Sequence, residues 1–358
     1  MSTVEVHQFV PSLAMRDAIG QHTFAMQAML RSVGIDSEIY ADEMKPGTEE
    51  LAKHYHHFHP RPSKNRLLIY QASTLSPMAA FLSERPEPKV LNYHNVTPPQ
   101  TIRQWEFGAS MATSIALDQI GKLSHQVVGS IAVSKFNASD LKSLGYDGPV
   151  VAAPFITHAS VEPRPDRDRP VGASWLFVGR IFPNKAQHDL VAALAAYRRI
   201  YDSAATLTLV GGRASERYAC AIEEYAKRLG ISDAVSITGS IPDDGMEDLY
   251  RTSDLFVCAS DHEGFCFPIV EAMRARLPVV AYGSSAIPET VGKAGFIVSD
   301  KSPINFATAA WITLTDSGLR NTFYRQSEIQ LEKYSPEEAR RQNLDALSNF
   351  IKLPLGVV

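Results

Sequence analysis

Short apolar runs that alternate with helical patterns, in two successive series, are the feature that most constrains the fold of this chain. The runs of the first series are VEVHQFV, SEIYA, RLLIYQA, KVLNYH and VVGSIAVS. Those of the second series are SWLFVG, TLTLVG, AVSITG, DLFVCAS, PVVAYG and GFIVSD. Runs that are apolar throughout are typical of strands covered on both faces, and strands separated by helices pair in parallel. The sequence therefore predicts two doubly wound, Rossmann-like α/β domains.

The two series are separated by a segment rich in proline and charge. Residues 154–173, PFITHASVEPRPDRDRPVGA, interrupt the alternation and have the composition of an interdomain linker that could act as a hinge. A chain of 358 residues is also long for a single core. We predict an N-terminal domain over residues 1–160, a C-terminal domain over 161–335 and a final helix over 336–358, which begins at the capping sequence SPEE.

Composition and charge exclude several classes of protein. The net charge of −4 gives no bulk attraction to nucleic acid, and an apolar fraction of 45% is typical of globular domains. The N-terminal sequence lacks the pattern of a signal peptide, and no apolar run is long enough to span a membrane. The three cysteines are odd in number and widely spaced, which indicates neither a disulfide framework nor a zinc site. We expect a cytoplasmic protein.

The stretch DHEGFCFPIVEAM joins the predicted strand DLFVCAS to a helix. Pro268 suits the first turn of that helix, which places Glu263 in the loop and Glu271 in the first turn. Unpaired amides before a helix, together with the helix dipole, stabilise an anion. The amides expected to face it are those of Phe265, Cys266 and Phe267. Two carboxylates beside an anion site suggest a polyhydroxylated phosphate ester as the ligand.

Two further loops carry residues suited to phosphate. VGRIFPNKAQHDLVAAL places Arg180 at a strand end and Lys185 beside a helix start, where both cations could contact a diphosphate. In the first series, Gly20 precedes a helical pattern, where the chain could pass close to a phosphate. Each residue alone also fits an ordinary structural role, as a solvated charge or a turn glycine. Their combination at successive strand ends favours a binding site.

These motifs resemble the C-terminal half of the family-four retaining glycosyltransferases, group 1, which have the GT-B fold. The resemblance rests on VGRIFPNKAQHDLVAAL, LVGG, VSITGSI, DLFVCASDHEGFCFPIVEAMRARLPVVAYGSSAIPETVG and GFIVSD, and covers about residues 170–300. It implies two Rossmann-like domains that face each other across a cleft. It further implies metal-independent transfer of a sugar from a nucleoside diphosphate sugar to an acceptor hydroxyl, with the anomeric configuration retained.

The resemblance also implies roles for individual residues. Arg180 and Lys185 would neutralise the diphosphate, Glu263 would hold sugar hydroxyls, and Glu271 would bind the ribose diol. His94, after the strand KVLNYH, would lie near the donor sugar, although a lone histidine is often structural. The implied catalytic residues are His94, Arg180, Lys185 and Glu263. The implied donor-binding residues are Gly20, Gly239, Ser240, Ile241, Gly264, Phe265, Cys266, Phe267 and Glu271. Many relatives have paired glycines where this chain has AIGQ, so the phosphate contact at Gly20 is the least supported.

The resemblance leaves several alternatives open. The donor could be a GDP- or UDP-hexose, with mannose or glucose favoured, and the acceptor a glycan or a lipid-linked glycan, with or without peripheral contact at the inner face of the membrane. No metal and no cofactor are expected. Retention could follow front-face attack or a double displacement through a carboxylate. A nucleotide-sugar epimerase of GT-B fold and a non-catalytic nucleotide-sugar-binding protein are the alternative functions.

Two other segments have simpler interpretations. The histidine-rich run KHYHHFHPRPSK is irregularly spaced and lacks acidic or cysteine partners, so a solvated loop is favoured over a metal site. A long helical pattern, QTIRQWEFGASMATSIALDQIGKL, predicts one helix, and contact with an acceptor or a membrane surface is its alternative role. The side chains expected to form its core face are Trp105, Phe107, Met111, Ile115 and Leu117.

Overall fold

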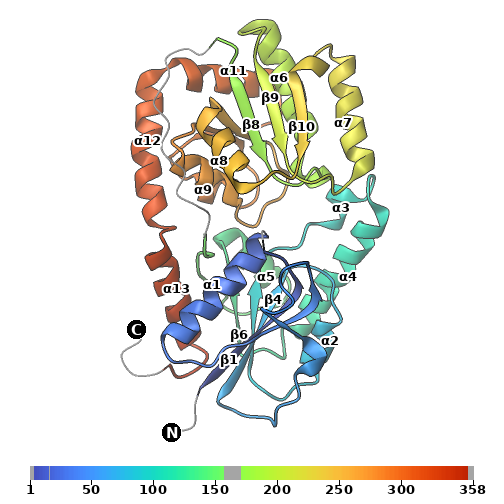
Figure 1. Ribbon diagram of the computed structural model, residues 1–358, viewed down its shortest axis with the longest axis vertical. Coiled ribbons are helices and arrows are strands. Elements are labelled where there is room, and N and C mark those ends of the chain that lie inside the picture. The colour runs from blue at the N-terminus through green and yellow to red at the C-terminus, as the bar shows by residue number, and fades with distance from the viewer. Residues whose placement is uncertain (1–3, 16, 157–170, 354–358) are drawn as a thin grey trace. The chain divides into compact units, whose positions relative to one another are not determined.

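The computed structural model describes residues 4–15, 17–156 and 171–353, which form two compact units (Figure 1). The first unit contains Met1–Pro99, Gly108–Thr157 and Lys333–Val358. The second contains Gln100–Phe107 and His158–Glu332. Most of the predicted linker, residues 157–170, lies outside the described residues, so the structure does not bear on its role as a hinge.

The first unit is built on a seven-stranded parallel sheet in the order β3-β2-β1-β4-β5-β6-β7. Its strands are β1 (Glu5–Leu13), β2 (Ile39–Met44), β3 (Lys53–His54), β4 (Arg66–Ala72), β5 (Lys89–Tyr93), β6 (Gly129–Ala132) and β7 (Val150–Val151). All seven residues of β4 are buried, as expected for a central strand covered on both faces. The five longer strands match the predicted runs, whereas β3 and β7 are too short to leave an apolar pattern.

Helices cover both faces of this sheet. They are α1 (Ala18–Ser32), η1 (Tyr55–His57), α2 (Met78–Ser83), α4 (Phe107–Leu123), α5 (Lys135–Ser143) and α13 (Pro336–Ser348). The predicted cap of the last helix is confirmed, because the Ser335 side chain accepts a hydrogen bond from the Glu338 amide. Asn343 of α13 donates to the Ala153 carbonyl at 3.0 Å, which fixes the C-terminal helix to the first unit.

The second unit has a six-stranded parallel sheet in the order β10-β9-β8-β11-β12-β13. Its strands are β8 (Ser174–Val178), β9 (Thr206–Val210), β10 (Val235–Gly239), β11 (Leu255–Cys258), β12 (Val279–Tyr282) and β13 (Phe296–Val298). Its helices are α3 (Pro99–Ile102), η2 (Pro183–Lys185), α6 (Gln187–Ile200), α7 (Glu216–Arg228), η3 (Ser232–Ala234), α8 (Asp243–Thr252), α9 (Phe267–Arg274), α10 (Ile287–Val291), α11 (Pro303–Thr315) and α12 (Ser317–Glu332). The two sheets confirm the predicted pair of Rossmann-like domains.

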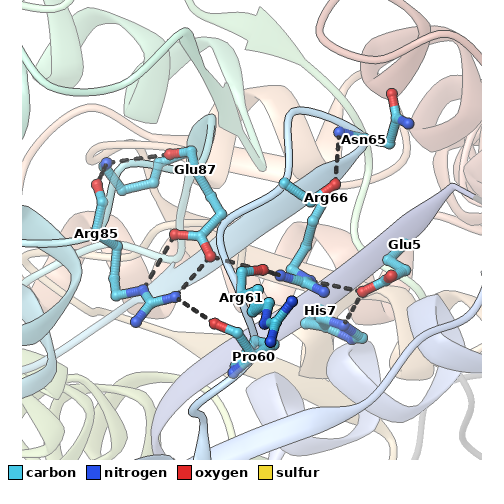
Figure 2. A network of polar contacts seen from close by, with 10 residues as sticks. Glu5, His7, Pro60, Arg61, Asn65, Arg66, Arg85 and Glu87 are labelled. Carbon is cyan, nitrogen blue, oxygen red and sulfur yellow. Dashed lines mark hydrogen bonds and ion pairs between the residues drawn. The ribbon is translucent and has the colours of Figure 1, made fainter.

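A network of buried and partly buried charges connects the amino ends of three strands in the first unit (Figure 2). Arg66 of β4 donates to the Glu5 carboxylate of β1 at 2.6 Å. Arg85 donates to both carboxylate oxygens of Glu87, at 2.6 and 3.1 Å, and the Arg66 guanidinium lies 3.6 Å from the same carboxylate. Both guanidinium groups also lie over the Phe58 ring. This charge network stands at the sheet edge opposite the carboxyl ends where ligands bind in such folds.

The long helix predicted over residues 100–123 is wrong in one respect, because it is broken into α3 and α4. Trp105 in the break packs edge-on against Tyr218 of the second unit, with ring centroids 5.2 Å apart. The predicted core face of this segment is wrong in part, although Trp105 and Leu117 are partly buried and pack against the apolar cores. Phe107, Met111 and Ile115 are exposed, and the buried residues of α4 are Ser110, Ala116, Ile120 and Leu123. The small residues Ser110 and Ala116 carry no strong apolar signal, which is why the sequence pattern pointed to the wrong face.

The histidine-rich run is more ordered than a solvated loop. Its first residues form β3 and η1, and Tyr55 and Phe58 are buried in the core of the first unit. The apolar residues between the histidines therefore anchor the segment, a signal that the count of histidines obscured.

Candidate donor site at the carboxyl ends of β8 and β11

The loops after β8 and β11 bring two of the predicted catalytic side chains into contact. Lys185 Nζ donates to Glu263 Oε1 at 2.6 Å, and the two side chains are only 17% and 11% exposed. Lys185 ends the short helix η2, while Glu263 belongs to the loop between β11 and α9. Parallel strands present their carboxyl ends at one edge of the sheet, which explains how residues 78 positions apart meet.

The same two loops are joined by backbone contacts. The Asp261 amide donates to the Asn184 carbonyl at 2.8 Å, and Asn184 Nδ2 donates to the His262 carbonyl at 3.2 Å. The Glu263 amide donates to Ser285 Oγ at 2.8 Å. Because the backbone on both sides of the ion pair is held, the Glu263 carboxylate is positioned before any ligand binds. Burial lowers the pKa of the neighbouring His262 to about 4, so this histidine is neutral at neutral pH.

Arg180 lies at the end of β8, as predicted, but it does not join the ion pair. Its side chain is exposed, and its guanidinium lies 5.8 Å from the centroid of the Phe182 ring. Within the part of the chain that the structure describes, no carboxylate pairs with it. A planar guanidinium held only by an aromatic ring keeps its hydrogen-bond donors for a phosphate.

Glu271 lies deeper in the site than the sequence indicated. Helix α9 begins at Phe267, so Glu271 is its fifth residue and not part of the first turn, which corrects that prediction. Its side chain is buried and accepts a hydrogen bond from the Tyr250 hydroxyl of α8 at 2.6 Å. Burial, and then the nearby Glu271 charge, raise the pKa of Tyr250, so its hydroxyl remains a donor. Each carboxylate oxygen accepts up to two hydrogen bonds, so Tyr250 orients the group without exhausting it.

The loop that enters α9 is tethered and turns sharply. Cys266 occupies the N-cap in the left-handed conformation, with φ at 72°, and its side chain caps no amide. The rings of Phe265 and Phe267 pack edge to face with centroids 5.3 Å apart. Thr290 of α10 donates through its hydroxyl to the Phe265 carbonyl. Gly264 precedes these residues and is partly exposed. The expected contact of these amides with a diphosphate stays a prediction.

The end of β11 also brings two cysteines together, which their spacing in the sequence did not indicate. The thiols of Cys258 and Cys266 and the carboxylate of Glu263 lie within 4.8 Å of one another. Hydrogen bonding between the two thiols lowers the pKa of Cys258 and raises that of Cys266. Sequence spacing missed this cluster because the loop from 259 to 265 returns the chain to the strand end. Cys220 is exposed elsewhere, on α7.

The predicted base-contacting residues lie at the end of β10 and directly after it. Gly239 has φ at 72°, which favours glycine, and its carbonyl accepts from the Gly211 amide at 3.0 Å. A Cβ at Gly239 would meet no atom within 4 Å, so the backbone there is open. Ser240 lies against Gly212, and Ile241 packs on the apolar cluster beneath α9. These residues sit at the same carboxyl edge as β8, β9 and β11.

His94, the predicted catalytic residue of the first unit, follows β5 and is held by a chain of buried amides. Gln8 Nε2 donates to the Thr23 carbonyl, so its oxygen accepts from Gln71 Nε2 at 2.7 Å. Gln71 Oε1 is then an acceptor, 2.6 Å from His94 Nε2. The neutral ring therefore carries its proton on Nε2 and presents Nδ1 as an acceptor. Burial lowers the pKa of His94 well below its ordinary value.

Gly20 lies at a different position in the fold from the one predicted on sequence. It lies within the first turn of α1, not before the helix, and its amide faces the Asp17 carboxylate at 3.4 Å. A Cβ there would stand 2.1 Å from the Ala14 carbonyl oxygen. Close packing of the helix on the chain that follows β1 requires glycine at this position, whether or not a phosphate binds nearby.

Sequence reasoning missed the residues that support the site. Gln8, Gln71 and Asn92 left a usable signal, because each is a polar residue inside a predicted buried strand. Tyr250 and Ser285 left none, since each becomes relevant only through contacts between segments far apart in the chain.

Comparisons with known proteins relate part of this chain to a family and the whole chain to a fold. Residues 172–316 match the family model described as "Glycosyl transferases group 1". The D-inositol 3-phosphate glycosyltransferase of Corynebacterium urealyticum is 29% identical over 184 residues, which cover 50% of this chain and 43% of that protein. The GDP-mannose-dependent alpha-(1-6)-phosphatidylinositol monomannoside mannosyltransferase of Mycobacterium tuberculosis is 33% identical over 148 residues, 39% of this chain and 37% of that protein. This chain thus spans less than half the length of these curated relatives.

The likeness of fold extends further than the likeness of sequence. The crystal structure of Anabaena Alr3699/HepE in complex with UDP-glucose superposes with a TM-score of 0.73 at 17% identity, over 96% of this chain and 99% of that chain. At this identity the comparison establishes the architecture alone. Residues 172–316 are therefore a domain of the glycosyl transferases group 1 family, in a chain that has the GT-B fold.

Proposed function

We propose that this protein is a retaining glycosyltransferase that moves a hexose from a nucleoside diphosphate sugar to an acceptor hydroxyl in the assembly of a glycan, polysaccharide or glycolipid. The observation that carries the proposal is the held Lys185–Glu263 pair, at 2.6 Å, inside the segment that matches the glycosyltransferase family. Mannose and glucose are the favoured sugars, because one similar protein is named for GDP-mannose and a similar structure holds UDP-glucose.

In the proposed chemistry, cationic side chains bind the diphosphate and carboxylates accept hydrogen bonds from hydroxyl groups. Arg180 and Lys185 stabilise the negative charge that develops on the leaving diphosphate, the task that a divalent metal performs in other transferases. Glu263, fixed by Lys185 and Ser285, accepts hydrogen bonds from sugar hydroxyls. Glu271, oriented by Tyr250, accepts from the ribose diol. The backbone after Gly239 contacts the base.

His94 supports the same reaction from the first unit. Its tautomer leaves Nδ1 as an acceptor for a hydroxyl of the donor sugar or the acceptor. A neutral histidine suits this role, since it does not compete with Lys185 for the diphosphate. We further propose that the leaving phosphate takes the proton of the acceptor hydroxyl, so that attack occurs on the same face as departure and retains the configuration.

A donor screen followed by a transfer assay tests the proposal. We expect one of UDP-glucose, GDP-mannose and their close analogues to raise the melting temperature more than the corresponding free sugar does. Transfer of that sugar to a glycan or lipid-linked acceptor, with the product anomer read by NMR, should show retention. Stabilisation by no nucleotide sugar at millimolar concentration, or an inverted product, would contradict the proposal.

A further inference from the structure

Two buried thiols and a carboxylate converge at the end of β11, and the proposed reaction has no use for the thiols. Their ligand atoms lie within 4.8 Å of one another, and Cys258 and Cys266 are both buried. A tetrahedral zinc ion bound at about 2.3 Å to sulfur and about 2.0–2.2 Å to oxygen sets its ligand atoms roughly 3.5–3.8 Å apart. Small side-chain rotations would bring the three atoms to that spacing.

We propose that Cys258, Glu263 and Cys266 bind a thiophilic divalent cation of the zinc class, and that the bound cation blocks the donor site. Two sulfur ligands select zinc-like cations over magnesium, which prefers oxygen in an octahedral arrangement. On binding, each thiol releases its proton to solvent, so two thiolates balance the charge of the cation. This balance allows a divalent ion to enter a buried position.

The carboxylate can serve the cation without losing its lysine. Lys185 contacts Oε1 of Glu263, and a carboxylate has a second oxygen that can ligate. The loop is also held, through Ser285 at the Glu263 amide and through Thr290 at the Phe265 carbonyl, so the three ligands lie on a supported backbone. A preformed arrangement lowers the ordering cost of binding.

Blocking follows from the position of the ligands and rests on the proposed function. Glu263 is the residue proposed to hold the donor sugar, and Cys266 is the N-cap of the helix proposed to face the diphosphate. A cation that links both to Cys258 would occupy the carboxylate and fix the loop. Donor binding and cation binding should therefore exclude each other. The metal is inhibitory in this scheme and takes no part in transfer.

A cadmium titration tests the binding itself without any assumption about activity. The Cys220→Ser protein keeps only the buried pair of thiols, because Cys220 is the third cysteine and is exposed. We expect Cd²⁺ to produce the ultraviolet thiolate-to-metal charge-transfer band, saturating at one equivalent with the intensity of two thiolates. Absence of the band, or an intensity of a single thiolate, would overturn the proposal. No buried residue is changed, so misfolding cannot explain a negative result.

Ligand variants in the same background then assign the site. Cys258→Ser and Cys266→Ser should each weaken Cd²⁺ binding by at least the ~10–100-fold that loss of a supporting partner costs at metal sites. Circular dichroism shows which variants are folded, and only these are compared. Cys→Ala variants at the same two positions are measured in case a Ser variant does not fold. Binding that is unchanged in a folded variant of either cysteine would refute the assignment.

The competition experiment distinguishes this inference from the proposed function. Saturating Cd²⁺ should weaken binding of the preferred nucleotide sugar at least about tenfold in the Cys220→Ser protein. The same addition to the folded Cys258→Ser variant, whose substitution lies outside the residues proposed to bind the donor, corrects for Cd²⁺ bound by the nucleotide alone. Cadmium binding by two thiolates in a protein that binds no nucleotide sugar supports the metal site and contradicts the proposed function. Simultaneous binding of cation and donor would overturn the blocking role.

Discussion

The charge network of the first unit and the Lys185–Glu263 pair of the second both hold charged side chains largely away from solvent. They differ in how many partners each charged group has within the protein. In the network, two arginines surround Glu87, whose side chain is 0% exposed, and each guanidinium also has a backbone carbonyl or a second carboxylate as partner. In the second unit, one lysine meets one glutamate beside two thiols. The charged groups of the network are paired with one another, whereas Lys185 and Glu263 each keep hydrogen-bonding positions for a ligand.

The location of each cluster agrees with this difference. The network connects the amino ends of β1, β4 and β5, at the edge of the sheet opposite the one where ligands bind in this fold (Figure 2). The ion pair lies at the carboxyl ends of β8 and β11, the edge where parallel sheets bind ligands. A buried charged group therefore indicates a binding site only when its partners in the protein leave some of its hydrogen-bonding positions for a ligand.

The largest effect should come from breaking the network. Glu87→Gln removes the negative charge between Arg66 and Arg85 and leaves two cations facing each other. Breaking a buried ion pair costs about 3–5 kcal/mol, so the free energy of unfolding in urea should fall by that amount. Turnover per folded molecule should stay near that of the parent. Glu43→Gln, which removes an exposed partner of Lys45, is the control and should change stability little.

A low-pH titration should reveal the next effect, through His22. Burial lowers the pKa of His22 to about 4. The Phe155 amide donates to His22 Nδ1 at 3.2 Å, so the neutral ring carries its proton on Nε2, beside the Asn92 side chain. Below its unfolded pKa near 6.5, the unfolded chain binds a proton that the folded protein excludes. Stability should therefore fall as pH drops from 6.5 to 4, by at most about 1.4 kcal/mol per unit for this group.

Replacing His22 separates its contribution from that of other groups. His22→Gln should lower stability at pH 7, because buried contacts are lost, but it should reduce the dependence of stability on pH between 6.5 and 4. Stability measured by urea unfolding at half-unit steps gives both quantities. An unchanged slope in the variant would show that other groups, His262 among them, cause the acid sensitivity.

Substitutions in the donor site should lower turnover and leave stability nearly unchanged, the opposite of what is expected for the charge network. Lys185→Ala removes a charge-assisted contact to the leaving group worth about 1.5–3 kcal/mol, so turnover should fall at least about tenfold. Arg180→Ala should have an effect of similar size. The melting temperature should change little for Arg180, which is exposed. Lys122→Ala, in an exposed pair with Asp118, is the matched control. Parental turnover in either site variant would refute the diphosphate role.

Much of the architecture, and less of the site, could be predicted from the sequence. The strands VEVHQFV and DLFVCAS were found because burial on both faces demands unbroken apolar runs. The face of α4 was not, because Ser110 and Ala116 are buried by neighbours that the sequence does not specify. Arg180, Lys185 and Glu263 were identifiable from their strand-end positions. The contacts of Tyr250 and the meeting of Cys258 with Cys266 depend on tertiary packing.

A smaller effect is expected at the ribose end of the proposed donor site. Glu271→Gln keeps the shape of the side chain but replaces a charged acceptor with an amide, so both the nucleoside diphosphate and the whole donor should bind more weakly. Tyr250→Phe removes one hydrogen bond to Glu271 and should weaken binding by about fivefold, equivalent to ~1 kcal/mol. Calorimetry with both ligands measures this. Undiminished binding of both by Glu271→Gln would contradict the ribose role.

Chelation should produce the smallest effect of all. Arg180, Lys185 and the amino end of α9 already supply positive charge beside the proposed diphosphate position, so transfer should proceed at the parental rate in excess EDTA. The thiol cluster sharpens this test, since removal of a thiophilic cation should never slow the enzyme and should raise the rate of any preparation that carries zinc. The initial rate of transfer is measured before and after EDTA, and then with magnesium or manganese added back. If EDTA abolished transfer and either metal restored it, a cation, and not Lys185 with Arg180, would be shown to neutralise the charge of the diphosphate.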